Sequence, residues 1–470
     1  MRKTKIICTI GPSSENEEVL TQMCLAGMNV ARLNFSHGSH SEHEKKIALI
    51  KKVREKLNLP IAILLDTKGP EYRIRTFKDG KVEIATGATF TFTIDEMEGD
   101  ETRVSVNYKL LNKDLKPGDI LTVNNGLVKF QVEKIEGSDI ITKCLMGGVL
   151  SNRKSMSFPN KVMSGPYLSE QDKEDIIFGI NHGVDYVAAS FVSCAQDVKD
   201  IRKLLDENGG SDIEIIAKIE NQAGVDNVKE ICENSGGIMI ARGDLGVEIP
   251  FVEVPAVQKK LTRICRMMGK RVITATEMLE SMIQNPRPTR AEISDVANAV
   301  YDGTSCIMLS GESAAGKYPV EAVRTMAEIA EYTEKQTDYK HRFLNTVFNG
   351  KSNLDNISHA VCSIALDLSA KAIVVCSVSG RTAMLVSRFR TPVDIIGMTT
   401  DVKIWRRLSM SWGVTPVMAE QFPNVDVMFY YGKKIAKDAL GLKAGDNIIM
   451  TGGPINGFSG NTDTIKIETI

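Results

Sequence analysis

Short apolar runs alternate with helix-like segments along most of this 470-residue chain. Strands are expected at residues 4–9, 28–34, 60–66, 184–191, 213–219, 237–242, 271–275 and 305–309. Helical patterns follow most of these runs, as at residues 223–235. Eight strand–helix units predict an α/β fold, in which a closed (β/α)8 TIM barrel is favoured over an open sheet.

Polar side chains gather where the expected strands end. They are Thr9, Arg32, Asn34, Asp66, Ser190, Lys218, Glu220, Asp244, Thr276, Ser310 and Glu312. In TIM barrels the active site lies at the rim formed by the carboxyl ends of the strands. Structural ion pairs scattered at random would not select that one rim, so we expect a functional site there.

One connection between expected strands is much longer than a barrel loop. Residues 70–166 lack a helical period and alternate like strands at 89–94, 120–123 and 128–132. Asn125-Gly126, between two of these runs, is typical of a hairpin turn. We expect a small β-barrel domain here, inserted into a loop of the TIM barrel and able to act as a lid over the rim.

The sequence turns polar near residue 340, and a second alternating pattern follows. Strands expected near 372–376, 394–398, 414–418, 446–450 and 464–467 predict a smaller α/β domain. The expected division is the barrel at 1–69 and 168–340, the lid at 70–167, and the C-terminal α/β domain at 341–470.

Composition and charge exclude several classes of protein. A net charge of −1 argues against a nucleic-acid partner, and no apolar run is long enough to cross a membrane. The first residues are typical of a strand and not of a signal peptide. The nine cysteines are scattered and never spaced C-x-x-C, which suits a reducing cytoplasm and argues against structural zinc.

Two consecutive expected strands end in opposite charges. Lys218 and Glu220 are two residues apart and therefore point to the same face of their strand. Together with Asp244 after the next strand, they can hold a divalent metal and an anion, which suits phosphoryl transfer or enolate chemistry. The alternative is a structural ion pair at a strand end.

The second strand ends in Arg32, Asn34 and Ser36, which alternate onto one face. The planar guanidinium of Arg32 can pair with a phosphate, and the Asn34 and Ser36 oxygens can hold a hard cation. Asp66, after the third strand, adds oxygens that suit a weakly bound monovalent ion better than zinc. A polar strand end that caps the next helix, and an Asx turn at Asp66, are the alternatives.

Other polar residues near strand ends allow more than one interpretation. Thr276 can donate to a substrate carboxylate, carry a proton through water, or cap a helix. His37, His40 and His43 are each three residues apart, which does not place all three on one helical face. Surface or capping roles are favoured for them over a metal site.

The C-terminal domain carries a candidate phosphate cradle. It consists of residues that follow a strand and open a helix: Ser377, Ser379, Gly380, Arg381 and Thr382. Hydroxyls, free backbone N–H groups and an arginine at a helix start suit an anion. A glycine-rich loop at 451–460 can close over the same ligand. The alternative is an ordinary strand–helix turn and a long hairpin.

Taken in order, several motifs resemble the pyruvate kinase family over nearly the whole chain. They are TIGPSS from Thr9, RLNFSHG from Arg32, LDTKGPE from Leu65, KIEN from Lys218, ARGDLG from Ala241, Ala275-Thr276 with Met278-Leu279, and NPRPTRAE from Asn285. No single motif is decisive, but together, at these separations, they are highly specific.

The resemblance implies that phosphoenolpyruvate and ADP give pyruvate and ATP. It implies Mg²⁺ (or Mn²⁺) at Glu220 and Asp244. It implies K⁺ at Asn34, Ser36, Asp66 and Thr67. The catalytic residues implied are Lys218, Arg32 and Thr276, and the substrate would be bound by these together with Gly243 and Asp244.

The family also implies residues beyond the reacting centre. The nucleotide side would be lined by Pro12, Asn34, His37, Arg73 and Lys154. The C-terminal cradle would bind a sugar-phosphate or nucleotide activator, and the assembly would be a homotetramer. Three segments depart from the family pattern. Asn124-Asn125-Gly126 replaces the D-D-G of the lid, Glu277 replaces a glutamine, and residues 154–160 keep the lysine and the proline but diverge between them.

Two other functions remain open from the sequence. One is a metal-dependent barrel enzyme that acts on enolpyruvate or a 2-oxo acid, such as an aldolase or mutase, and dependence on ADP distinguishes it. The other is an inactive metabolite-binding regulator, which loss of the lysine or of a metal carboxylate would indicate.

Overall fold

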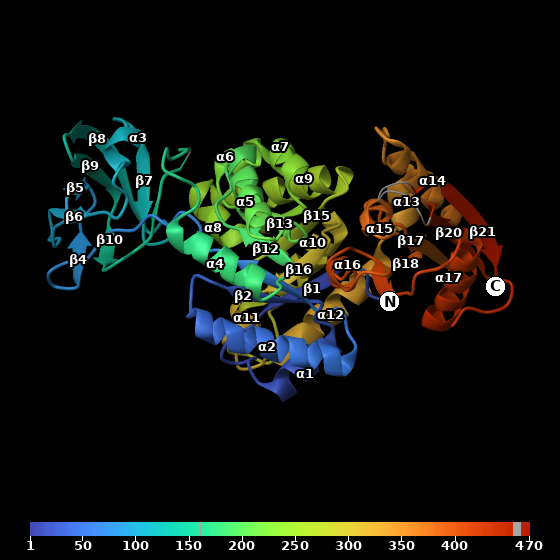
Figure 1. Ribbon diagram of the computed structural model, residues 1–470. Helices are drawn as coiled ribbons and strands as arrows, with labels where there is room; N and C mark the ends of the chain where they lie inside the picture. The colour runs from blue at the N-terminus through green and yellow to red at the C-terminus, as the bar shows by residue number, and fades with distance from the viewer. Residues whose placement is uncertain (160, 455–461) are drawn as a thin grey trace.

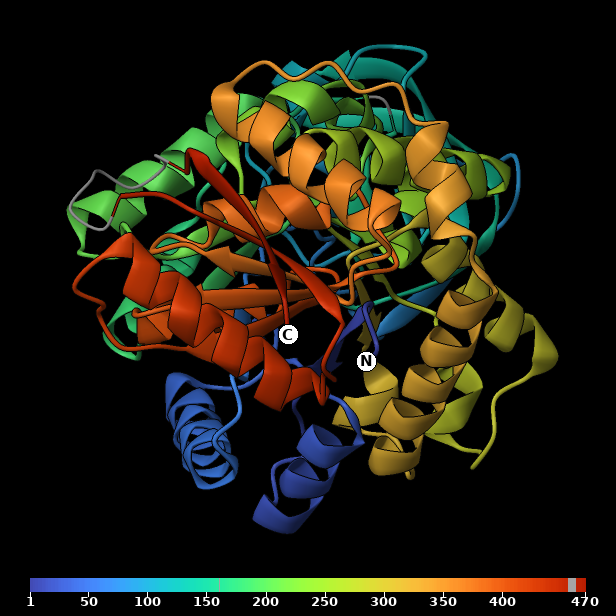
Figure 2. The ribbon, with the colours of Figure 1, turned by 90° about the vertical axis from the view of Figure 1, so that its right-hand side faces the viewer.

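The computed structural model describes residues 1–159, 161–454 and 462–470, whose elements form three lobes in a row (Figure 1). The barrel lies in the middle, with a β-rich insert on one side and a C-terminal α/β module on the other. Figure 2, turned by 90°, places the C-terminal module in front and shows the N-terminus beside it. The predicted fold class is confirmed.

Parallel strands close the barrel in the order β1-β16-β15-β14-β13-β12-β3-β2. Their bounds are β1 (Lys5–Thr9), β2 (Val30–Asn34), β3 (Ala62–Asp66), β12 (Tyr186–Ala189), β13 (Glu214–Ile219), β14 (Gly237–Ala241), β15 (Arg271–Ala275) and β16 (Cys306–Leu309). Nearly all of their residues are buried, because the barrel interior covers one face and the outer helices cover the other. Each strand coincides with an apolar run predicted from the sequence.

Helices surround the barrel. They are α1 (Glu17–Ala26), α2 (His40–Leu57), α4 (Glu170–Asn181), α5 (Ala195–Glu207), α6 (Gln222–Asp226), α7 (Val228–Asn234), α8 (Arg242–Glu248), α9 (Val254–Met267), α10 (Arg290–Asp302), α11 (Gly311–Ala314) and α12 (Pro319–Gln336), with 3-10 turns η1 (Phe251–Glu253) and η2 (Glu280–Ile283). The single helix predicted at residues 223–235 is wrong: Asn227 ends α6 and begins α7. Its side-chain amide donates to Ser193 O (2.9 Å), which holds the break in place.

Capping boxes fix where three of these helices begin. Ser39 caps α2, Ser169 caps α4 and Thr289 caps α10, each with an acidic residue three positions later that bonds back to the cap. Because these helices start immediately after rim loops, the caps also fix the lengths of the loops that carry the site.

The insert is a small β-barrel. Its strands are β4 (Lys81–Ile84), β5 (Thr89–Thr93), β6 (Arg103–Ser105), β7 (Ile120–Val123), β8 (Val128–Glu136), β9 (Asp139–Met146), β10 (Gly148–Ser151) and β11 (Met156–Ser157), with the short helix α3 (Leu111–Asp114). Six of the strands form one sheet, β11-β7-β8-β9-β5-β6. The segment before β4 closes the ring, because Arg73 bridges to Ser155 beside β11 and Ile74 bridges to Val106 beside β6.

The predicted hairpin at Asn125-Gly126 joins β7 to β8. Asn124, Asn125 and Gly126 all have positive φ, which asparagine and glycine tolerate better than other residues do. The Asn125 side chain accepts a hydrogen bond from Ser155 Oγ (3.0 Å), so the turn is tied to the neighbouring strand.

The C-terminal module is a five-stranded sheet in the order β19-β18-β17-β20-β21, parallel except for the last pair. Its strands are β17 (Ala372–Cys376), β18 (Asp394–Thr399), β19 (Val414–Met418), β20 (Asn447–Gly452) and β21 (Thr464–Thr469). Its helices are α13 (Tyr339–Leu344), α14 (Asn353–Asp367), α15 (Arg381–Ser387), α16 (Val402–Leu408) and α17 (Val425–Leu440). Within the described residues, no helix is both long and apolar enough to cross a membrane.

The module is docked on the barrel end opposite the rim. Arg406 Nε lies 2.8 Å from the buried carboxylate of Asp185, and Tyr186 Oη donates to Arg407 O (2.6 Å). Met410 packs among the inward-facing side chains of the barrel core. A further ion pair joins the N-terminal segment to the module: Lys3 Nζ lies 2.8 Å from Asp394 Oδ1. The docking leaves the rim free to face the insert.

Candidate active site

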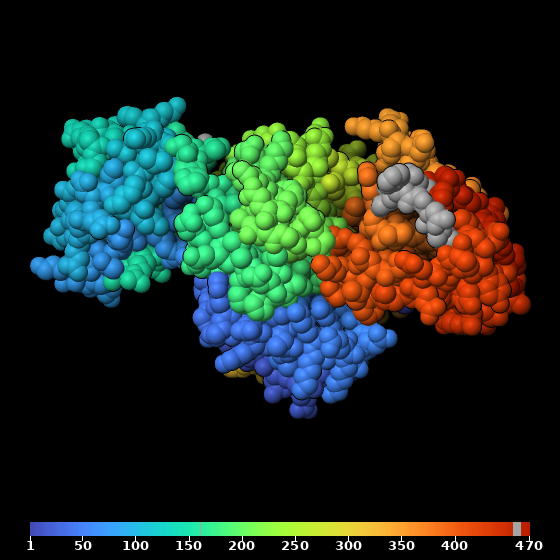
Figure 3. All heavy atoms as spheres, viewed as in Figure 1, coloured from blue at the N-terminus to red at the C-terminus, as the bar shows by residue number. Residues whose placement is uncertain are grey.

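A cleft of about 590 Å³ lies between the barrel rim and the insert. In the space-filling view the insert stands apart from the barrel along a waist (Figure 3). Several residues expected at the site line the cleft: Arg32, Asn34, Ser36, His37, Arg73, Lys218, Glu220 and Asp244. The lining comes from the rim on one side and from the insert on the other, as a lid arrangement requires.

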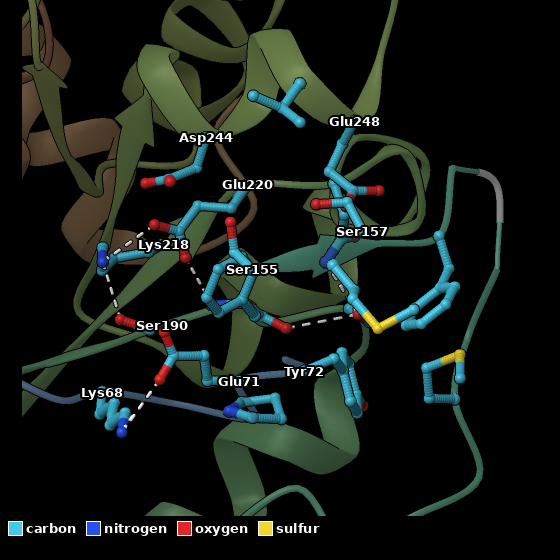
Figure 4. Close-up of a pocket in the computed structure, with 18 of the residues that line it drawn as sticks. Lys68, Glu71, Tyr72, Ser155, Ser157, Ser190, Lys218, Glu220, Asp244 and Glu248 are labelled. Atoms are coloured by element: carbon cyan, nitrogen blue, oxygen red, sulfur yellow. Dashed lines mark hydrogen bonds and ion pairs between the residues drawn. The ribbon is translucent and has the colours of Figure 1, made fainter. Parts of the chain in front are cut away.

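Lys218, in β13, lies at the centre of a buried charged cluster (Figure 4). Its ammonium Nζ is 2.9 Å from Glu220 Oε1, 3.1 Å from Asp66 Oδ1 and 2.7 Å from Ser190 Oγ. Burial alone would lower the Lys218 pKa, but the carboxylates of Asp66 and Glu220 raise it above its ordinary value. The side chain is therefore a fixed cation.

Arg32, in β2, is held beside this lysine. Its Nε binds Asp66 Oδ2 at 2.6 Å, and its Nη1 donates to Thr9 Oγ1 at 2.8 Å. Burial would raise the Asp66 pKa, but Arg32 and Lys218 hold it below its usual range. The rim thus presents two cations that share one carboxylate.

Glu220 and Asp244 place two acidic side chains on the same side of the cleft (Figure 4). Glu220 is fully buried, and burial, together with Asp244, raises its pKa to about 8 against the opposing effect of Lys218. Phe191 N donates to Glu220 Oε2 (2.6 Å), and Oε1 lies 2.9 Å from Lys218 Nζ. Two neighbouring carboxylates at the cleft offer the hard oxygen ligands that suit a divalent cation, which completes its shell with water and substrate oxygens.

The four residues expected around a monovalent cation are contiguous in the structure. Asn34 and Asp66 are paired across β2 and β3, and Asn34 Oδ1 accepts from Ser36 N (3.1 Å). Thr67 follows Asp66 and is buried. Amide, hydroxyl, carbonyl and carboxylate oxygens are the donor set that a hard monovalent ion accepts.

Thr276 lies beside the cleft but is not part of its lining. Its Oγ1 accepts from Gly243 N (2.8 Å) and donates to Ala275 O (2.6 Å). Thr276 and Glu277 both have positive φ, which is strained for residues other than glycine. The strained turn joins Gly243, on α8, to the end of β15. Gly243 and Thr276, two of the residues expected to bind substrate, are therefore held next to each other.

The nucleotide-side residues are spread over both lobes. His37 and Arg73 line the cleft, while Pro12 and Lys154 lie outside its lining. The Arg73 guanidinium is paired with Glu71 and donates to Arg153 O (2.5 Å). His43 is buried, contacts His37 O (2.9 Å) and stacks on Phe35, so the surface or capping role favoured from the sequence is wrong for this histidine.

The residues expected to form the C-terminal cradle lie between β17 and the first turn of α15. Gly380 has φ +72 at the start of α15, and Arg381 is exposed. Thr382 is buried, and its hydroxyl lies 2.7 Å from that of Thr462. Residues 455–460 of the glycine-rich loop lie outside the described residues.

Two residues that the structure places at the site had no predicted role there. Ser190 was recognised only as one of the polar strand ends, although its hydroxyl contacts Lys218. Glu248, at the end of α8, faces Ser157 and Phe158 of the insert, and burial raises its pKa to about 7. No residue pattern signalled the Glu248 contact, because it joins segments about ninety positions apart.

A fixed lysine–arginine pair and two acidic side chains at the rim of a (β/α)8 barrel define a phosphotransferase type of site. The family model for the pyruvate kinase barrel domain matches residues 1–323, and that for the pyruvate kinase alpha/beta domain matches residues 355–468. The chain belongs to the pyruvate kinase family.

Known proteins agree with this assignment over the full length. The chain is 47% identical to a pyruvate kinase of Clostridium acetobutylicum and 45% identical to one of Clostridium perfringens, in both cases over 100% of each protein. A crystal structure of a pyruvate kinase from Cryptosporidium parvum is similar with a TM-score of 0.94 and 37% identity, covering 100% of this chain and 96% of that one.

Proposed function

We propose that this enzyme transfers the phosphoryl group of phosphoenolpyruvate to ADP, giving pyruvate and ATP in glycolysis. The observation that carries the proposal is the pairing of Arg32 and Lys218 through Asp66 at a cleft that the insert overhangs. Transfer of a phosphoryl group between two anions needs positive charge and positioning more than it needs a covalent nucleophile. The buried cluster supplies both.

Each residue of the cluster has a defined part in this proposal. Lys218 stabilises charge on the transferring phosphoryl group, and Arg32 helps to bind it. Their shared carboxylate, Asp66, fixes both side chains before the substrate arrives, so little reorganisation is needed during transfer. Thr276 and Gly243 bind the substrate, and Thr276 lies near the carbon that is protonated.

Two classes of cation complete the proposed site. Glu220 and Asp244 would hold Mg²⁺ (or Mn²⁺), and Asn34, Ser36, Asp66 and Thr67 would hold K⁺. When bound, these ions supply further positive charge next to the phosphate oxygens. Carboxylate-only protein ligands favour Mg²⁺ or Mn²⁺ over softer metals.

The remaining parts of the chain have proposed auxiliary roles. The insert, residues 70–167, closes over ADP, whose side of the site is formed by Pro12, Asn34, His37, Arg73 and Lys154. The module from residue 341 binds a phosphorylated activator, a sugar phosphate or a nucleotide, at Ser377, Ser379, Gly380, Arg381 and Thr382. We propose a cytoplasmic homotetramer.

A coupled assay for pyruvate tests the reaction. Turnover is expected with phosphoenolpyruvate, ADP, Mg²⁺ and K⁺ together and is expected to be lost when ADP is omitted. Glu220→Gln should raise the Mg²⁺ concentration needed for half-maximal rate, and should weaken Mn²⁺ binding measured by electron paramagnetic resonance. A folded protein with no turnover under any sugar phosphate or nucleotide would reject the proposal.

A further inference from the structure

Ser190 places a hydroxyl inside the charged cluster described above. It directly follows β12 and is only 1% exposed. Its Oγ lies 2.6 Å from Thr67 O, 2.7 Å from Lys218 Nζ and 3.3 Å from Asp66 Oδ1. One small side chain therefore contacts the lysine, the last residue of β3 (Asp66) and the residue that follows it (Thr67).

The hydrogen bonds of this hydroxyl can be assigned from chemistry alone. A serine hydroxyl has one proton to donate and lone pairs that accept. The Thr67 carbonyl can only accept and the Lys218 ammonium can only donate. The Ser190 proton therefore points to Thr67 O, its shorter acceptor, and a lone pair faces Lys218 Nζ.

This contact differs from the other two that Lys218 makes. Asp66 and Glu220 hold the ammonium but also neutralise its charge. The hydroxyl of Ser190 accepts a hydrogen bond from the third N–H of the ammonium and, because it is neutral, adds no negative charge. It can thus fix the position of the ammonium while leaving its charge available to an incoming anion.

Ser190 is itself firmly held. Its backbone N donates to Thr67 Oγ1 (3.2 Å), and its carbonyl accepts from Tyr167 Oη (2.8 Å). Gly69 packs against it so closely that an added Cβ would lie 2.7 Å from Ser190 Cβ. The next residue, Phe191, adopts φ +57 and donates its N–H to Glu220. The same turn therefore positions both Lys218 and Glu220.

We propose that Ser190 is a positioning residue, which orients the Lys218 ammonium toward the cleft and anchors it to the backbone at Thr67. The proposal rests on the role of Lys218 proposed above. Ser190→Ala should lower kcat about 10- to 100-fold, the scale expected when a reacting group is misplaced, and should change KM for phosphoenolpyruvate less than threefold. Ser190→Thr, which restores a hydroxyl, should recover most of the rate.

A second variant guards against misfolding. Ser190→Cys leaves no cavity, because the thiol is somewhat larger than the hydroxyl, but it offers only a weak acceptor, so it should lose rate as Ser190→Ala does. Ser358→Ala is the matched control, because Ser358 is also fully buried and its hydroxyl also donates to a backbone carbonyl, Leu354 O at 2.6 Å, but far from the site. It should keep kcat. Loss of kcat in the control to the same extent would overturn the proposal.

A double-mutant cycle separates action through Lys218 from an independent role. In a Lys218→Arg background, adding Ser190→Ala should change kcat less than twofold. If the same 10- to 100-fold loss appears in both backgrounds, or if Ser190→Ala keeps the wild-type kcat, the proposal is wrong.

A readout that does not depend on turnover completes the test. Reductive methylation, mapped by mass spectrometry, should label Lys218 several-fold faster in Ser190→Ala than in the wild type. Exposed Lys203 should be labelled at the same rate in both proteins. Unchanged labelling of Lys218 would overturn the proposal, whereas absence of turnover in the wild type would reject the proposed function instead.

Discussion

Arg32 and Lys218 bind opposite oxygens of one carboxylate, that of Asp66: Nε lies 2.6 Å from Oδ2, and Nζ lies 3.1 Å from Oδ1. Two buried cations that contact the same carboxylate lie close enough to repel each other, and the Arg32 charge accordingly acts to lower the Lys218 pKa. The carboxylate offsets that repulsion and sets the distance between the two side chains. Asp66 is therefore the organiser of the cluster.

Asp66→Asn tests this relationship. The amide keeps the shape but removes the charge, so Arg32 and Lys218 should separate and kcat should fall about 100-fold, as expected when reacting groups move by about 1 Å. Steady-state kinetics with both substrates saturating measures the change. A kcat within threefold of the wild type, in a folded protein, would show that the shared carboxylate does not organise the site.

Lys218→Met tests the cation itself. The substitution removes the positive charge and leaves the buried carboxylates of Asp66 and Glu220 without their partner, so kcat should fall at least about 1,000-fold. Lys203→Met, at a side chain that is 75% exposed on α5, is the control and should keep its rate. Circular dichroism should show both variants folded. Near-normal turnover of Lys218→Met would remove Lys218 from the mechanism.

The barrel could be predicted from sequence because its strands are buried on both faces and therefore appear as continuous apolar runs. The strands β4, β6, β10 and β11 of the insert were missed, since short strands with one exposed face leave weak patterns. The strand β9 was also missed, although it is eight residues long. The single helix expected at residues 223–235 failed for a different reason: Asn227 bonds to a distant loop, and such a tertiary contact overrides local periodicity.

The arrangement of the site residues also follows partly from the local sequence and partly from contacts between distant segments. That Lys218 and Glu220 share a face follows from the two-residue period of a strand. That Asp66 is shared by Lys218 and Arg32 depends on the order and register of β2, β3, β12 and β13, which the sequence does not state. The Asp185–Arg406 pair, 221 positions apart, lies equally beyond sequence patterns.

Arg381→Ala tests the proposed activator site. Arg381 is exposed at the start of α15, so its loss should weaken activation by phosphorylated metabolites without abolishing basal turnover. The measurement is the concentration of each sugar phosphate or nucleotide that gives half-maximal activation, which should rise at least tenfold for the true activator. Lys371→Ala, also exposed in this module, should leave it unchanged. An identical activation curve for Arg381→Ala would reject the site.

His359 makes the stability of the C-terminal module depend on pH. Its ring lies 5.1 Å from that of Phe343, 5.4 Å from Phe348 and 5.2 Å from Phe389, in a small apolar cavity that Arg388 and Arg266 also line. Burial, reinforced by the Arg388 charge, lowers the His359 pKa below 6.5. The folded module therefore holds this histidine neutral.

The sign of the effect follows from proton uptake. As pH falls, the unfolded chain, whose histidine titrates near 6.5, binds a proton before the folded chain does. The contribution of neutral His359 to stability is thus complete above pH 6.5 and is lost as pH falls from 6.5 through the lower folded pKa. His359→Phe keeps an aromatic ring in the stack but cannot take up a proton, so its urea-denaturation midpoint should fall less between pH 7 and pH 5 than that of the wild type. His359→Gln is a second variant, for the case in which phenylalanine packs poorly in the cavity. Its midpoint should show the same shallower dependence on pH, because the effect depends on removing the titrating group and not on the packing. Parallel midpoint curves for all three proteins would mean that His359 is protonated equally easily in the folded and unfolded chains, and that the aromatic cavity does not control its charge.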